Sequence, residues 1–264
     1  YHNIDSLMTF LDFGDQISVK KSDKFHLKIE GDFSQSLENR VNLIEVTLSR
    51  LERFYKRKFS VEVILKKNLP IASGMAGGSS NAATFVKCIR EMYELEELNG
   101  FDSLLLSLGA DVPFCYNGRS AIVSGIGEKI EFIKELRNYL ILLINPKVEV
   151  ATEEMFQSLN MKKQLSDLTK KNNNKYLNNI DYLKSRRNDL EKYAVKKNKI
   201  IGEILSKLSS CKGTLLSRMT GSGGTCFALF KNVKDLEVAK NDVRKSFKKC
   251  WIKSAKLINS VSHI

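Results

Sequence analysis

Hydrophobic and polar residues alternate along several short stretches of the chain, and a period of two is typical of β-strands. Residues 15–21 and 25–30 alternate in this way one after the other, which predicts a pair of neighbouring strands. Short apolar or alternating runs predict the remaining strands. These runs lie at 59–66, 121–124, 129–132, 140–145, 214–219, 226–230 and 251–258.

Between these strands, apolar residues recur at every third or fourth position, which is the period of an amphipathic helix. Helices are predicted at 39–58, 79–93, 101–108 and 233–247, and a helical pattern with polar interruptions covers 152–209. Because helices and strands mix without strict βαβ alternation, the fold class is predicted to be α+β. We expect two domains, residues 1–136 and 137–264.

The composition is that of a globular protein. The chain has 264 residues, of which 42% are hydrophobic and 28% charged, and it is long enough to bury a large core. Its longest aliphatic run, at 139–144, is far shorter than the ~20 residues of a membrane-spanning helix. No signal-peptide pattern is present at the first residues, so we expect a cytoplasmic protein without a membrane partner. Since the sequence does not begin with Met, we expect it to start inside a longer protein.

The five cysteines are widely spaced and form no C-x-x-C motif, so we expect free thiols in a reducing compartment. They are Cys88, Cys115, Cys211, Cys226 and Cys250. The net charge is +13, and residues 162–199 contain 12 basic and 4 acidic side chains. This segment is either a nucleic-acid-binding surface or a solvated helical surface rich in Lys and Asn. We favour the second interpretation, because no aromatic residues are interleaved for stacking, and we expect no nucleic-acid partner. A positive field also attracts phosphorylated substrates.

A loop of small residues joins the predicted strand at 59–66 to the predicted helix at 79–93. It consists of Pro70, Ile71, Ala72, Ser73, Gly74, Met75, Ala76, Gly77, Gly78, Ser79 and Ser80. Its three glycines allow the backbone to approach a ligand closely. The start of a helix presents unpaired N–H groups and the positive end of the helix dipole. The loop therefore predicts a polyphosphate site, in which the two serines can also contact Mg²⁺; a flexible turn is the alternative. The pattern matches neither a Walker A loop nor a dinucleotide-binding fingerprint.

A lone Asp provides the candidate for acid–base chemistry. Asp111 lies in the sequence G-A-D-V-P-F, where Pro113 is expected to keep Val112 extended and so to fix the exit from a turn. A carboxylate held in this way can accept the proton of a substrate hydroxyl during phosphoryl transfer. Taken alone, the segment also fits an ordinary Asx-turn.

A second glycine-rich segment, T-G-S-G-G at 220–224, lies between two predicted strands. It is either a turn or a place where the backbone approaches a second group of a ligand.

In this order, the three segments resemble the ATP loop, the catalytic Asp segment and the third motif of the galactose, homoserine, mevalonate and phosphomevalonate (GHMP) kinases. Three further pieces, at 1–7, 77–83 and 188–191, narrow the resemblance. They are similar to members that phosphorylate the 2-hydroxyl of a cytidine-diphosphate-linked methylerythritol in the non-mevalonate isoprenoid pathway. The resemblance implies an N-terminal domain like ribosomal protein S5 domain 2 and a ferredoxin-like C-terminal domain.

The resemblance also implies roles for individual residues. Asp111 is implied to be the catalytic base, and the loop at 70–80 is implied to bind ATP with Mg²⁺. Asn42 and Lys67 are implied to handle adenosine. The implied substrate-binding residues are Tyr1 and Phe156 on the faces of cytosine, His2 at its edge, and Thr152, Asp111, Gly221, Ser222 and Gly223. The alternative for Phe156 is an ordinary core aromatic on a helix.

One expected motif is absent from the sequence. The family's first motif, which carries a Lys and an Asn on an opening strand, is expected ahead of Tyr1. Two other functions remain open at this point. A sister kinase, such as homoserine or mevalonate kinase, shares the fold and the loop but not the Tyr-His pair. A non-enzymatic nucleic-acid-binding protein with an S5-like domain needs neither the glycine-rich loop nor Asp111.

Overall fold

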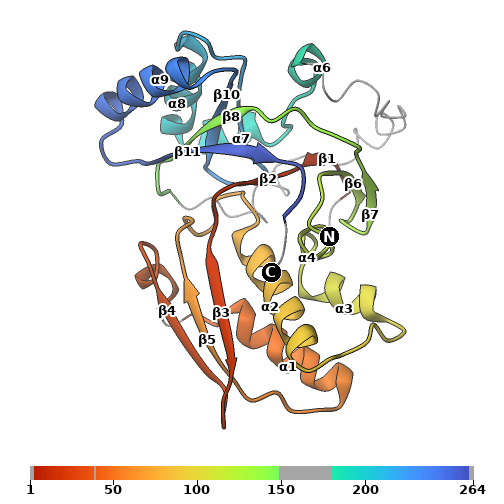
Figure 1. Cartoon of the computed structure of the whole chain (residues 1–264). Coiled ribbons are helices and arrows are strands. Elements are labelled where there is room, and N and C mark those ends of the chain that lie inside the picture. The colour runs from red at the N-terminus through yellow and green to blue at the C-terminus, as the bar shows by residue number, and fades with distance from the viewer. Residues whose placement is uncertain (1–2, 39, 149–179, 262–264) are drawn as a thin grey trace.

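The computed structural model describes residues 3–38, 40–148 and 180–261, which form three β-sheets with helices packed on them (Figure 1). The strands are β1 (Ile4–Met8), β2 (Phe10–Leu11), β3 (Gln16–Lys21), β4 (His26–Glu30), β5 (Val61–Lys66), β6 (Ala121–Gly125), β7 (Lys129–Phe132), β8 (Leu140–Asn145), β9 (Leu216–Met219), β10 (Cys226–Phe230) and β11 (Trp251–Ile258). The helices are η1 (Gln35–Leu37), α1 (Leu43–Tyr55), α2 (Gly77–Met92), α3 (Phe101–Leu108), α4 (Val112–Asn117), α6 (Ile180–Ser185), α7 (Glu191–Lys197), α8 (Lys199–Ser210) and α9 (Val233–Ser246).

The first half of the chain is built on a sheet with the order β3-β5-β4. The alternation along β5 buries Val61, Val63 and Leu65 in one core with apolar residues of α1 and α2, such as Ile44 and Phe85. The prediction that β3 and β4 pair with each other is wrong, because β5 lies between them, antiparallel to β3 and parallel to β4. The parallel pairing follows from the long crossover through α1, whereas a short connection favours a hairpin.

The second half is a ferredoxin-like unit, as the resemblance implies. Strands β8 to β11 are arranged β11-β8-β10-β9, with α8 ahead of the second strand and α9 ahead of the fourth. Leu142 and Ile144 of β8 pack with α8 and α9, while Ile141 and Leu143 face apolar residues from the first half. Burial on both faces explains why β8 reads as a continuous apolar run.

The two halves share one sheet and one core. β2, from the first half, extends the ferredoxin-like sheet by pairing with β11. In Figure 1 this sheet, with α8 and α9, lies above the β3-β5-β4 sheet with α1 and α2. The smaller β1-β6-β7 sheet lies beside them.

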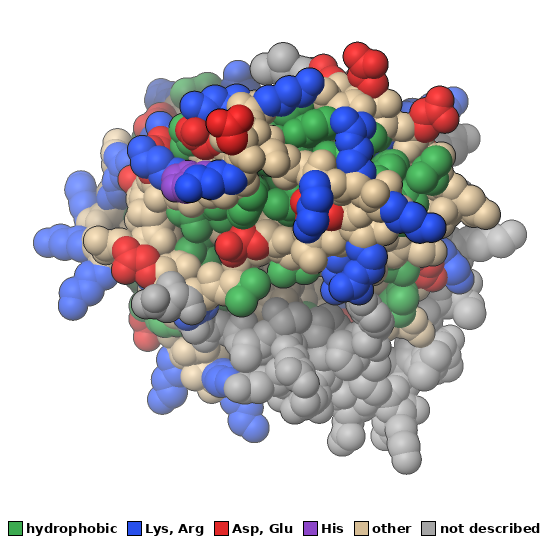
Figure 2. All heavy atoms as spheres, turned by 90° about the horizontal axis from the view of Figure 1, so that it is seen from below, with side chains coloured by type: hydrophobic (Ala, Val, Ile, Leu, Met, Phe, Trp, Pro, Cys, Tyr) green, Lys and Arg blue, Asp and Glu red, His purple; other side chains and the backbone are tan. Residues whose placement is uncertain are grey.

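The surface and the cysteines add two observations. Figure 2 views the molecule from below, and positive and negative side chains are interspersed on this face instead of forming one basic patch. None of the helices within residues 3–38, 40–148 and 180–261 is long and apolar enough to cross a membrane.

All five cysteines are free thiols, as expected. Burial raises the pKa of Cys226 to about 12.

Candidate active site

The ATP loop, residues 70–80, connects β5 to the start of α2. The helix begins at Gly77, two residues earlier than predicted, so Ser79 and Ser80 lie within its first turn. Ala76 precedes it in a left-handed conformation with φ 49°. No acidic side chain occupies the first turn, so the unpaired N–H groups and the positive end of the dipole favour an anion here.

The start of α2 carries no side chain at Gly77 and Gly78, although the packing around these two positions does not require glycine. A Cβ atom on Gly78 would lie no closer than 3.9 Å to another heavy atom, Cδ2 of Leu43. On Gly77 the nearest neighbour would be 3.4 Å away. Both glycines are helical, where Ala is favoured over Gly by roughly 0.5–1 kcal/mol. These two positions therefore fit a backbone that a phosphate approaches.

Gly74, in contrast, is required by contacts within the protein. Its φ is +72°, and a Cβ atom here would lie 2.3 Å from the carbonyl oxygen of Thr220. A Cβ atom on Gly223 would lie 2.1 Å from the backbone nitrogen of Gly74. The Thr220 hydroxyl donates a hydrogen bond to the Gly74 carbonyl at 3.1 Å. We expected the glycines of both segments to let the backbone approach a ligand. At Gly74 the close approach is instead between the ATP loop and the C-terminal glycine segment, residues 220–224.

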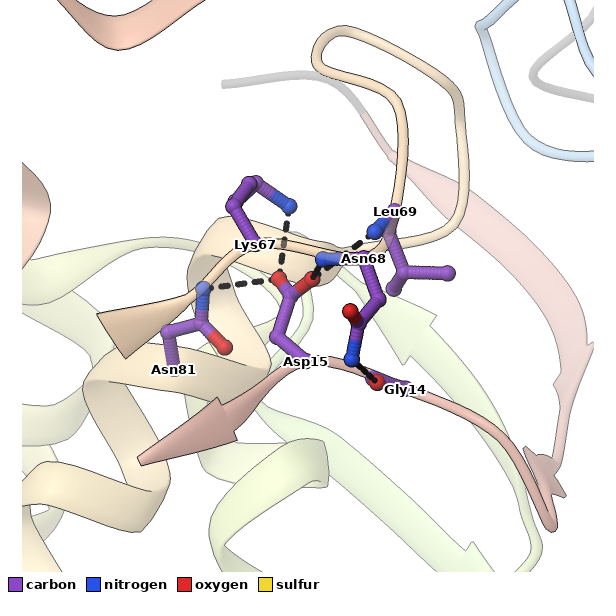
Figure 3. A network of polar contacts seen from close by, with 6 residues as sticks. All are labelled: Gly14, Asp15, Lys67, Asn68, Leu69 and Asn81. Carbon is purple, nitrogen blue, oxygen red and sulfur yellow. Dashed lines mark hydrogen bonds and ion pairs between the residues drawn. The ribbon is translucent and has the colours of Figure 1, made fainter. Parts of the chain in front are cut away.

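A buried carboxylate fastens both ends of the ATP loop (Figure 3). Asp15 accepts hydrogen bonds from the Asn68 and Leu69 N–H groups, at 2.8 and 2.9 Å, just before the loop. It also accepts from Nδ2 of Asn81, at 2.9 Å, on the helix that follows the loop. Nζ of Lys67 completes the network at 2.6 Å. Asp15 was not predicted as a site residue. In the sequence it is only the first residue of a strand, because its partners are more than 50 residues away.

Lys67 is held in this network at the start of α2. Its side chain is 5% exposed and that of Asp15 is 1% exposed. Burial lowers the pKa of Lys67, and the ion pair with Asp15 opposes this shift. A Cβ atom on Gly77 would lie 3.5 Å from Nζ of Lys67. Oδ2 of Asp15 would lie 3.6 Å from the same Cβ atom, so the ion pair adds no net charge beside the helix start. The implied role of Lys67 with adenosine stays a prediction.

Asn42 occupies the N-cap of α1. Its side chain accepts a hydrogen bond from the Ile44 N–H at 3.0 Å, and Glu45 accepts one in return from the Asn42 N–H. This capping box gives Asn42 a role in starting the helix. The implied contact of Asn42 with adenosine stays a prediction.

Asp111 directly precedes α4, a short helix that the sequence analysis read as a turn. The expectation that Pro113 keeps Val112 extended is wrong, because Val112 is the first helical residue. Proline is tolerated in the first turn of a helix, where its missing N–H is not needed. Burial raises the pKa of Asp111. Within the described part of the chain, no side-chain hydrogen bond or ion pair engages its carboxylate, which leaves it available as a proton acceptor.

The segment that carries Asp111 packs against the first turn of α2. A Cβ atom on Gly109 would lie 3.6 Å from Oγ of Ser79. On the other side, a Cβ atom on Gly127, in the turn between β6 and β7, would lie 2.2 Å from the carbonyl oxygen of Ala110. These contacts place the segment of the candidate base against the candidate phosphate site.

Four of the predicted substrate-binding residues lie outside the described residues. They are Tyr1, His2, Thr152 and Phe156. Gly221, Ser222 and Gly223 lie in the C-terminal glycine segment, beside the ATP loop. The proposed contacts of these residues with the substrate stay predictions.

The fold and the sequence both match one class of kinases. The GHMP kinases N terminal domain matches residues 42–119, and the GHMP kinases C terminal domain matches residues 163–249. A crystal structure of a 4-(cytidine 5'-diphospho)-2C-methyl-D-erythritol kinase superposes with a TM-score of 0.76 at 23% identity, over 99% of this chain and 92% of that chain. A homoserine kinase from Cytophaga hutchinsonii superposes with a TM-score of 0.75 at 16% identity, over 97% and 89%. The chain is thus an ATP-dependent kinase of the GHMP class.

Sequence identity to curated relatives shows which family within this class the chain belongs to. The 4-diphosphocytidyl-2-C-methyl-D-erythritol kinase of Chelativorans sp. is 39% identical over 88% of this chain and 80% of that protein. The enzyme of the same name from Clostridioides difficile is 35% identical over 96% and 86%. The chain belongs to the family of 4-diphosphocytidyl-2-C-methyl-D-erythritol kinases. The likeness to homoserine kinase, at 16% identity, concerns the fold alone.

Proposed function

We propose that this chain transfers the γ-phosphoryl group of ATP to the 2-hydroxyl of 4-diphosphocytidyl-2-C-methyl-D-erythritol, with Asp111 as the general base. The observation that carries this proposal is the position of the Asp111 segment against the first turn of α2. It brings a proton acceptor beside a bare helix start that suits a triphosphate.

ATP is proposed to place its phosphates over Gly77 and Gly78, where N–H groups of the first turn point outward. Asn42 and Lys67 are proposed to contact adenosine. The hydroxyls of Ser79 and Ser80 would hold Mg²⁺, which would neutralise part of the negative charge of the phosphates.

Asp111 is proposed to orient the substrate hydroxyl and to accept its proton as the oxygen attacks the γ-phosphorus. Positioning and charge stabilisation contribute most of the rate in phosphoryl transfer, because the protein forms no covalent bond. The raised pKa of Asp111, caused by burial, suits a general base, whose efficiency increases as its pKa approaches the working pH.

Cytosine is proposed to stack between Tyr1 and Phe156, while His2 binds its edge. Thr152 and the C-terminal glycine segment, with Gly221, Ser222 and Gly223, are proposed to complete the substrate site. In this arrangement residues 1–136 form the ATP-binding domain and residues 137–264 the substrate-side domain.

The test is phosphoryl transfer from ATP, followed by phosphorus NMR, with four acceptors. These are the cytidine substrate, its uridine analogue, homoserine and mevalonate. We expect rapid turnover of the cytidine compound alone. The uridine analogue is expected to bind about 5- to 150-fold more weakly, because an unpaired buried polar group costs ~1–3 kcal/mol. Turnover of homoserine or mevalonate in preference to the cytidine compound would contradict the proposal.

A further inference from the structure

The motif N-D-L-E at 188–191 forms hydrogen bonds with the backbone of the C-terminal glycine segment and of the residue before it. The Asn188 amide donates hydrogen bonds to the carbonyl oxygens of Met219 and Gly221, at 2.9 and 2.8 Å. Its Oδ1 accepts from the Leu190 N–H at 3.0 Å. Glu191 accepts from the Met219 N–H at 2.8 Å. The side chain of Asn188 thus uses both of its donors and its acceptor on backbone groups.

The backbone that Asn188 holds is the same backbone that contacts the ATP loop. A Cβ atom on Gly221 would lie 2.8 Å from the Gly74 carbonyl oxygen. The neighbouring Thr220 donates its hydroxyl hydrogen bond to that same oxygen. A displacement of Gly221 therefore changes the space available to Gly74, in the middle of the ATP loop.

We infer that Asn188 is a positioning residue for ATP, acting through the C-terminal glycine segment on the ATP loop. The side chain fixes the carbonyl groups on either side of Thr220, and Thr220 transmits this position to Gly74. The inference rests on the proposed function, since it assigns ATP to the loop at 70–80. Asn188 itself is not a catalytic residue, because its hydrogen bonds all go to protein backbone.

The test is a calorimetric titration of ATP into the whole chain and into Asn188→Ala, without an acceptor. The variant is expected to bind ATP about 2- to 12-fold more weakly, the loss of roughly one net hydrogen bond that holds the glycine segment in position. Steady-state kinetics are expected to show the same rise in KM for ATP, with kcat at saturating ATP and KM for the acceptor little changed.

The matched control is Asp189→Ala, at the next residue of the motif. Asp189 is 46% exposed and pairs with Arg187 instead of the glycine segment. It is expected to leave ATP affinity unchanged. Thr220→Val is the second variant, for the case that Asn188→Ala does not fold. It removes only the hydroxyl bond to Gly74 and is expected to weaken ATP binding in the same direction.

Wild-type ATP affinity in folded Asn188→Ala, or in Thr220→Val if the first variant does not fold, would overturn the inference. A lower kcat with unchanged KM for ATP would overturn it too, because it would place Asn188 on the acceptor side. The proposed function fails separately, if the unmodified chain binds ATP but does not phosphorylate the cytidine compound. A chain that binds no ATP would overturn both.

Discussion

The two glycine-rich segments of this protein look alike in sequence but contain glycine for different physical reasons. In the ATP loop, Gly77 and Gly78 have room for a side chain and a helical backbone that does not need glycine. In the C-terminal glycine segment, Gly221 and Gly223 press against the backbone of Gly74 and have no such room. Room beside a glycine indicates a position kept bare for a ligand, whereas lack of room indicates a position set by packing.

The two segments also differ in what holds them. The ATP loop is fastened at both ends by one buried carboxylate, Asp15, which accepts four hydrogen bonds. The C-terminal glycine segment is held by hydrogen bonds from the side chains of Asn188 and Glu191 to its backbone and to that of the residue before it. The ATP loop is thus held by a buried ion pair and its hydrogen bonds. The C-terminal glycine segment is held by the neutral amide of Asn188 and by one carboxylate, that of Glu191.

The largest expected effect is a loss of turnover that leaves both glycine-rich segments unchanged. Asp111→Asn is expected to reduce kcat by roughly 10²- to 10⁴-fold, the usual contribution of a general base. Since the amide has nearly the same shape, ATP affinity and the contact between the loops are expected to remain. Single-turnover kinetics and ATP calorimetry measure the two quantities independently. Wild-type turnover in this variant would remove Asp111 from the mechanism.

The second prediction concerns the buried carboxylate of Asp15, which holds both ends of the ATP loop. Asp15→Asn leaves Lys67 buried without its partner and is expected to lower the free energy of unfolding by about 3–5 kcal/mol. Because Lys67→Met removes the uncompensated charge, the double variant is expected to recover part of this loss. Urea denaturation measures all three proteins. Equal stability of Asp15→Asn and the unmodified chain would show that the ion pair does not support the loop.

The third prediction contrasts the two kinds of glycine directly. Gly223→Ala forces a methyl group against Gly74 and is expected to lower the free energy of unfolding by about 1–3 kcal/mol. Gly78→Ala is the matched control. It is expected to preserve or raise stability by up to ~1 kcal/mol, because Ala is the better helix residue. If both variants lose the same stability, the distinction between open and packed glycines is incorrect.

The smallest expected effect is a shift in the pH profile. Asp111 acts as its carboxylate, so kcat falls as the pH drops through its pKa. Because burial raises that pKa, the acidic limb is expected above the ordinary Asp value of ~3.9. Rate measurements across acidic pH, with an acceptor present at saturation, locate the limb. A limb at the ordinary value, or one that persists in Asp111→Asn, would assign the titration to another group.

The sequence predicted the elements whose signals are local. The strand at β5 and the helix α3 follow from apolar periodicity and glycine boundaries, and the predicted bounds of α3 and of β7, β8, β10 and β11 agree with the structure. The roles implied for Asp111 and for the loop at 70–80 stay predictions, while the segment that carries Asp111 packs against the first turn of α2.

The errors involve contacts between residues distant in sequence. The pairing of β3 and β4 was wrong because the choice of neighbour depends on the crossover through α1. The four donors to Asp15 come from residues 52 to 66 positions away, so no local pattern marks this Asp. The short strand β2 was missed because its pairing with β11 brings together opposite ends of the sequence.

The most direct test of the account is ATP calorimetry on folded Gly78→Val. A Cβ atom at this position has no neighbour closer than 3.9 Å, and the methyl groups of Val cover the helix start where the phosphates are proposed to bind. Circular dichroism and thermal unfolding first establish that the variant is folded. The account predicts that ATP binding is lost while the fold is kept. Unchanged ATP affinity in the folded variant would contradict it and would make the loop at 70–80 an ordinary turn.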